Sequence, residues 1–183
     1  MTSARKQRRE VARWEASTRA WATSRGKDLA LELYQQSDVA VTPYSVGLVL
    51  EQGEKPWVQV PAYCSLDAHV PAWCAPKSGD RHPLPPVGDW LITNHRIAGR
   101  CNRGLLRWWR WGEIVGCRVD LTLGRETVQI DLNGKPPILW TGPGVGPLAV
   151  AVVYHLYGAA AMLDHPGLAA LRGATAAISK GRT

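Results

Sequence analysis

The chain has 183 residues, of which 45% are hydrophobic and 20% are charged. This length fits one globular domain with an appendage, and the hydrophobic fraction is high enough to build a core. The formal net charge of +7 favours an acidic partner, although charge governs association rather than fold. The four cysteines form no dense framework and we recognise no signal peptide, so we expect reduced thiols and a cytoplasmic protein.

The first 42 residues are predicted to form a basic helical segment. Val11, Trp14, Thr18 and Trp21 recur at spacings of three, four and three, which places them on one helical stripe, and Leu29 and Leu33 continue the helix. The stripe is too narrow to stabilise a helix alone in water, so we expect it to dock on the body, on a second copy or on a partner. The candidates for that interaction are Arg9, Arg13, Trp14 and Trp21.

From residue 46 onward the hydrophobic pattern changes to alternation, which predicts short strands. "VGLVLEQGEKPWVQVPAY" should give two strands around a turn at residues 52–55. "DWLITNHRIAGRC" should give a hairpin that turns at Thr93 and Asn94. Residues 64–88 are rich in proline and show no regular period, so we expect a long surface loop there.

Residues 145–163 carry no acidic or basic side chain over about the minimal length of a membrane span, roughly 18 to 20 residues. Pro147, His155 and Gly158 argue against a span. Because the larger apolar residues recur at helical spacing, the pattern favours a helix packed along a β-core. The remaining residues, 166–183, are predicted to form a flexible tail.

Three stretches carry a resemblance to a known family. "VGLVLEQGEKPWVQVPA" resembles a first hairpin with a Gly-Glu turn, and "GDWLITNHRIAGR" resembles a Thr-Asn-x-Arg turn between two strands. "RWGEIVGCRVDL" resembles the line that follows, an aromatic and an acidic residue before a strand. In this order the three resemble the bacterial PH-like and GRAM-like domains.

The resemblance implies an α+β fold. It predicts a mainly antiparallel PH-like barrel or sandwich over residues 43–165, with a C-terminal capping helix, preceded by the long N-terminal helix of residues 1–42. The long loop at residues 64–88 departs from the compact turn of the family, which puts in doubt any ligand site built from that rim.

The stretch "RWWRW" at residues 107–111 interleaves arginine with tryptophan. Successive side chains of a strand alternate between faces, so Trp108 and Arg110 share one face while Arg107 and Trp109 share the other. Neither face is purely aromatic, which indicates an ordinary strand with solvated arginines or the edge of an anionic rim. A PH-type module would use such a rim for lipid headgroups. The candidate rim consists of Arg96, Arg100, Arg103, Arg107 and Arg110.

One group of residues has the types that bind zinc. Two cysteines and two histidines can hold a tetrahedral zinc ion. The pattern lacks the short Cys-x2-4-Cys spacing of strong zinc motifs, so we expect no metal and no cofactor, and zinc stays a minor alternative. The four residues are Cys64, His69, Cys74 and His82.

The sequence shows no catalytic motif. It contains no Gly-rich phosphate loop, no paired-carboxylate motif and no nucleophile elbow. We therefore expect a non-enzymatic binding or adaptor module that contacts an acidic or protein partner, or a second copy, through the basic helix and the arginine rim. Two alternatives remain open: a nucleic-acid-associated protein that uses the same surfaces, and a peripheral protein of anionic membranes. No small-molecule substrate is expected.

Overall fold

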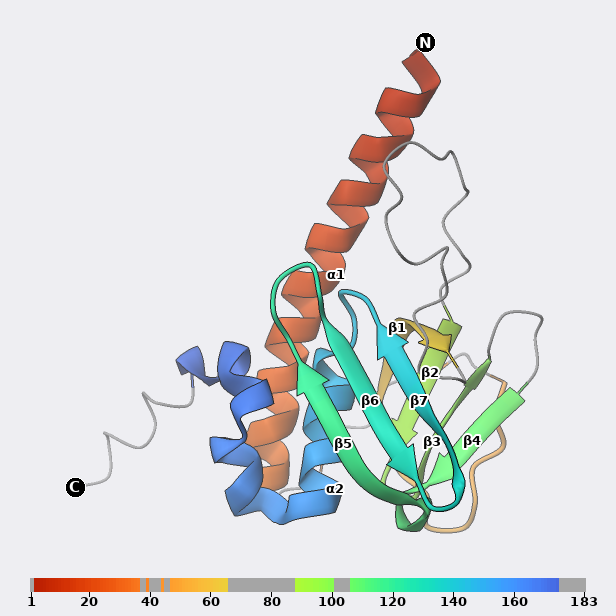
Figure 1. Cartoon of the computed structure of the whole chain (residues 1–183), viewed down its shortest axis with the longest axis vertical. Helices are drawn as coiled ribbons and strands as arrows, with labels where there is room; N and C mark the ends of the chain where they lie inside the picture. The colour runs from red at the N-terminus through yellow and green to blue at the C-terminus, as the bar shows by residue number, and fades with distance from the viewer. Residues whose placement is uncertain are drawn as a thin grey trace.

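A computed structural model describes residues 2–36, 39, 44, 47–65, 88–100 and 106–174. It shows an α+β architecture with an N-terminal helix, a seven-stranded antiparallel sheet and a C-terminal helix (Figure 1). This confirms the predicted α+β class, with a helix before the antiparallel strands and another after them. In chain order the elements are α1 (Thr2–Tyr34), β1 (Pro56–Ser65), β2 (Gly88–Thr93), β3 (Arg96–Arg100), β4 (Leu106–Arg110), the 3-10 helix η1 (Trp111–Glu113), β5 (Ile114–Asp120), β6 (Thr127–Leu132), β7 (Lys135–Thr141), α2 (Gly146–Asp164) and the 3-10 helix η2 (Pro166–Ala174).

The strands form one sheet in the order β4-β3-β2-β1-β7-β6-β5. β1 joins its two halves, because Val58 lies opposite Ile92 of β2 while Tyr63, further along, lies opposite Thr141 of β7. β4 and β5 are the edges of the described sheet, so the sheet is open, whereas the resemblance implies a barrel or sandwich. Figure 1 shows α1 and α2 side by side next to the β5 edge.

Three tryptophans from different strands form an aromatic cluster in the core. The ring of Trp90 on β2 lies 5.8 Å from that of Trp109 on β4, and both rings lie 5.5 Å from Trp140 on β7. Trp109 is only 7% exposed, whereas its neighbour Trp108 is 51% exposed. The predicted alternation along residues 107–111 is therefore confirmed, with Trp109 on the core side.

The helix α1 docks through a face that includes Thr18 of the predicted stripe and the predicted continuation at Leu29 and Leu33, but not Trp21. Trp14 is half-buried and Trp21 is 40% exposed, so neither defines the docking face. The reason is close packing, since a Cβ on Gly26 would lie only 3.2 Å from Leu171 Cδ1 of η2. The buried positions of α1 are Thr18, Ala22, Gly26, Leu29 and Leu33, which follow helical spacing.

The helix α2 starts against α1 and runs into the core. A Cβ on Gly146 would lie 2.9 Å from the carbonyl oxygen of Ala22, and the whole first part of α2, Gly146 to Val153, is buried. Among the described helices, α2 is the one that could cross a membrane by length and composition, yet half of that window is buried in the protein. The burial supports the predicted packed helix. Gly158, at φ 81°, breaks the helical geometry near its end.

Two parts of the chain differ from the prediction. Residues 47–50 form no strand, although one was expected before the turn at residues 52–55, and the carbonyl of Val49 accepts a hydrogen bond from the Arg96 side chain. The predicted tail begins with η2, in which Leu168 and Leu171 are buried, so its first part is packed on the core. Residues 175–183 of that tail, and 66–87 of the predicted loop, lie outside the described residues.

The packing of Trp90 provides a test of this core. Gly99 lies opposite Trp90, and a Cβ there would lie 2.5 Å from the carbonyl oxygen of Asp89 and 2.6 Å from the Trp90 ring. We expect Gly99→Ala to lower the free energy of unfolding in urea by about 1–3 kcal/mol through overpacking. The matched control is Gly112→Ala, where no atom lies within 4 Å of the added Cβ, and it should cost less than about 0.5 kcal/mol. Equal losses would contradict this account.

Candidate functional site

The three stretches that carry the family resemblance meet at one end of the sheet. Glu54, in the turn before β1, is buried and accepts hydrogen bonds from two nitrogens of Arg96, each at 2.8 Å. The hydroxyl of Thr93 donates to the same carboxylate at 2.8 Å and accepts the backbone N–H of His95 and of Arg96. The Thr-Asn-x-Arg turn therefore binds the Gly-Glu turn.

Asn94 completes the connection between these turns. Its side-chain oxygen accepts the backbone N–H of Lys55 at 2.6 Å, and its side-chain nitrogen donates to the carbonyl of Gly53 at 3.1 Å. The third stretch joins through Trp111, whose indole N–H donates to the carbonyl of Thr93 at 3.0 Å. Thr93, Asn94 and Arg96 thus have structural roles in this end of the sheet.

Charge is balanced within this network. Burial opposes ionisation of Glu54, but hydrogen bonds from Arg96, from the backbone N–H of Glu51 and from Thr93 outweigh it, so the pKa of Glu54 is lowered. Arg110 donates to Glu51 at 2.6 Å. The sequence alone did not pair Glu54 with Arg96 or Glu51 with Arg110, because the two residues of each pair lie 42 and 59 positions apart in the chain.

A stack of three rings lies beside the network. The imidazole of His155 on α2 lies between Trp111, at 4.0 Å between ring centroids, and Trp57, at 5.2 Å, with all three rings nearly parallel. Burial lowers the pKa of His155 to about 4, which keeps the ring neutral at pH 7. Its Nε2 has no hydrogen-bond partner within the described part of the chain.

A shallow depression of about 530 Å³ opens over the network and the stack. Glu51, Glu54 and His95 place one ligand atom each within 4.8 Å of one another, which is a spacing that a cation could use. Both carboxylates already accept hydrogen bonds from guanidinium groups, so a metal ion would have to displace Arg96 or Arg110. The donor set fits an internal ion-pair network better than a metal site.

The five arginines of the predicted rim do not form one surface. Arg96 is buried on Glu54, Arg110 is paired with Glu51, and Arg107 lies on the opposite face of β4 from Arg110. Arg100 is exposed at the end of β3, and Arg103 lies outside the described residues. Of the four zinc candidates, Cys64 is half-buried on β1. His69, Cys74 and His82 lie outside the described residues.

The first turns of α1 form a second candidate site, which we call the basic arm and define as residues 5–13. Every residue of the arm is exposed except Val11, which is half-buried, and Figure 1 shows this end of α1 projecting past the sheet. Lys6 and Glu10 form an exposed pair at 4.0 Å. Within the described chain, the other basic residues of the arm have no ion-pair partner: Arg5, Arg8, Arg9 and Arg13.

The Glu54–Arg96 pair predicts a large difference between two arginines. Arg96→Ala leaves Glu54 buried without its counter-ion and should lower the free energy of unfolding by about 3–5 kcal/mol. Arg107→Ala removes an exposed arginine and should cost less than about 0.5 kcal/mol. Urea unfolding followed by tryptophan fluorescence measures both, and a loss for Arg96→Ala below 1 kcal/mol would show that the pair does not hold the turns together.

The buried histidine predicts a pH dependence of stability. The unfolded chain takes up the His155 proton near pH 6.5, whereas the folded chain resists it until about pH 4, so stability falls as the pH falls through this range. His155→Phe keeps an aromatic ring between Trp57 and Trp111 and removes the titration. We expect it to remove about 3 kcal/mol of the stability lost between pH 6.5 and 4. Parallel stability curves for both proteins would contradict the assignment.

Comparison with known proteins adds no relative. Neither a protein-family model nor a curated protein matches the chain. The PH-like and GRAM-like resemblance stays a prediction, based on three short stretches that the structure brings to one end of the sheet.

Proposed function

We propose that this chain is a non-enzymatic binding module of the cytoplasm, in which a PH-like scaffold holds α1 and presents the basic arm to an acidic protein partner. The observation that carries the proposal is the exposed arm, whose arginines have no internal counter-ion in the described chain. The scaffold and the arm are supported by separate observations.

The strand order supports the PH-like scaffold. Two antiparallel groups, β1 to β4 and β5 to β7, share β1 as the connecting strand, and a C-terminal helix follows them. The motif residues Thr93, Asn94 and Arg96 hold the first turn in place, which is a reason for these residue types that needs no catalysis. In this proposal the sheet supports the arm, and binding occurs outside the hydrogen-bond network of Glu54, Thr93 and Arg96.

The arm has a surplus of like charge that a partner would neutralise. Arg5, Arg9 and Arg13 follow one another at intervals of four residues, so their side chains are neighbours on one face of the helix. Like charges at this spacing destabilise a helix by a few tenths of a kcal/mol per pair, about 0.2–0.5. An acidic surface laid along this face would turn the repulsion into attraction.

The residues next to the arm favour a protein partner over a nucleic-acid partner. Trp14 and Trp21 lie further along the same helix and are partly or well exposed, and tryptophan and arginine are the residue types enriched in protein interfaces. A nucleic-acid protein that used the rim as well would need free arginines there, yet Arg96 and Arg110 are already paired. The arm is therefore the main basic surface that the described residues offer.

The test replaces Arg5, Arg9 and Arg13 together by glutamine in the full chain. A tagged wild-type chain, this arm variant and a control should be used to recover partners from the source cells at two salt concentrations. The control, Arg107, Arg118 and Arg125→Gln, removes the same charge from exposed positions on the body. We expect a protein that is retained by the wild type and the control, released at high salt, and lost from the arm variant.

The same three proteins should be mixed with a short DNA duplex and with vesicles containing anionic lipid. We expect the arm to give weak, salt-sensitive binding to both, because any polyanion attracts it. Tight binding to either probe that persists at physiological salt would overturn the choice of a protein partner. A partner recovered equally by the arm variant would overturn the role of the arm.

A further inference from the structure

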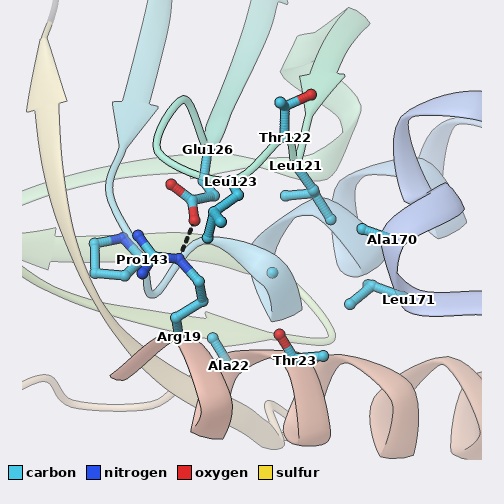
Figure 2. A pocket seen from close by; sticks show the side chains of 11 residues that line it. Arg19, Ala22, Thr23, Leu121, Thr122, Leu123, Glu126, Pro143, Ala170 and Leu171 are labelled. Atoms are coloured by element: carbon cyan, nitrogen blue, oxygen red, sulfur yellow. Dashed lines mark hydrogen bonds and ion pairs between the residues drawn. The ribbon is translucent and has the colours of Figure 1, made fainter. Parts of the chain in front are cut away.

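A cavity that is partly open to solvent lies where α1, the β5–β6 turn, α2 and η2 meet (Figure 2). Its volume is about 310 Å³, which is within the lower range of small-molecule pockets. The cavity is remote from the rim and belongs to neither surface considered above. Figure 2 shows that residues far apart in the sequence line it, with Arg19 and Glu126 at one end and Leu121, Ala170 and Leu171 at the other.

The polar end is an ion pair between α1 and the β5–β6 turn. The Nε of Arg19 donates to one oxygen of Glu126, and the backbone N–H of Gly124 donates to the other oxygen at 3.1 Å. The hydrogen bond to Glu126 raises the pKa of Arg19 despite burial. Burial acts to raise the pKa of Glu126, but the bonds from Arg19 and the backbone outweigh it and lower that pKa, so both groups are charged.

Most of the hydrogen-bonding capacity of Arg19 is unused. A guanidinium has five N–H donors, and in the described structure only the one on Nε has an acceptor. The side chain is 28% exposed, so these donors are partly withdrawn from water. Figure 2 shows the guanidinium beside Pro143, at the end of the cavity. Its two terminal nitrogens are the groups that bind a carboxylate or phosphate through two parallel hydrogen bonds.

The rest of the wall is apolar. Ala22, Leu121 and Leu171 contribute hydrocarbon surface, and the cavity has room for roughly ten waters at their liquid volume. A chain of a few methylene groups would replace water there and gain about 0.8 kcal/mol for each buried group. The cavity therefore offers an anion-binding end and an apolar body.

We propose that this cavity binds a small amphiphile with an anionic headgroup, a medium-chain alkyl carboxylate or phosphate. The headgroup takes the terminal nitrogens of Arg19 at the Pro143 end, and the alkyl chain extends from there past Ala22 toward Leu121 and Leu171. The site is separate from the basic arm, so its test does not depend on the proposal of an acidic protein partner. The net charge of +7 favours an anionic over a cationic ligand.

The test titrates the full chain with decanoate, decyl phosphate, decanol and decyltrimethylammonium, each below its micelle concentration. Isothermal titration gives the affinities, and the chemical shifts of Arg19 Nε and the Leu121 and Leu171 methyls report the location. We expect both anions to bind and to shift these signals, with decanol weaker and the cationic amphiphile weakest. The carboxylate and phosphate arms show which headgroup the site prefers.

Two pairs of variants separate the site from general effects. Arg19→Gln should weaken decanoate about tenfold to hundredfold, whereas Arg125→Gln removes a nearby exposed charge that does not line the cavity and should have little effect. Ala170→Trp fills the cavity from an exposed position and should abolish binding. Its control, Ala169→Trp, places the same ring one residue away, outside the lining.

Thermal unfolding must show that each variant is folded before its affinity is compared. Absence of binding by both anions at millimolar concentration would overturn the proposal. Equal affinity for the cationic amphiphile, or decanoate binding that survives Ala170→Trp, would overturn it as well. Either result would leave the binding of the arm to an acidic partner unaffected.

Discussion

The buried ion pair between Glu54 and Arg96 joins two turns that are 42 residues apart, and the end of the sheet depends on it. Removing two charges from water is costly, and the cost is offset only where the remaining hydrogen-bonding capacity is satisfied. Each oxygen of Glu54 accepts two hydrogen bonds: one oxygen from Arg96 and Thr93, the other from Arg96 and the backbone N–H of Glu51. Because Trp111 binds the carbonyl of Thr93, the fixed region extends to the start of β5.

This network decides where the excess positive charge is free to act. A guanidinium that binds a buried carboxylate through two of its nitrogens, as Arg96 binds Glu54, cannot also hold an external anion without leaving that carboxylate unpaired; Arg19 differs, because it binds Glu126 through Nε alone. Arg96 is committed in this way, and Arg110 is engaged with Glu51 at the surface. The arginines of the basic arm have no comparable partner in the described chain, although the sequence alone makes the two groups look alike. Their difference comes from tertiary pairing, which charge counting does not detect.

Elements set by local pattern were predictable, and features set by long-range packing were not. Alternation placed Trp108 and Trp109 on opposite faces, and helical spacing over residues 145–163 predicted a packed α2, which follows from local geometry. The docking face of α1 was predicted only in part: helical spacing indicated Thr18, Leu29 and Leu33, whereas Ala22 and Gly26 line the face because they allow close approach to α2 and η2. The cavity was missed, since its walls come from four separate segments.

The two halves of α1 are linked through helix stability. Short isolated helices are marginal in water because nucleation is unfavourable, so the exposed arm owes its helical form to continuity with the docked half that starts near Thr18. Arg19 lies at that junction and makes its ion pair with Glu126 across the interface. This ion pair fixes the junction between the docked half of α1 and the arm.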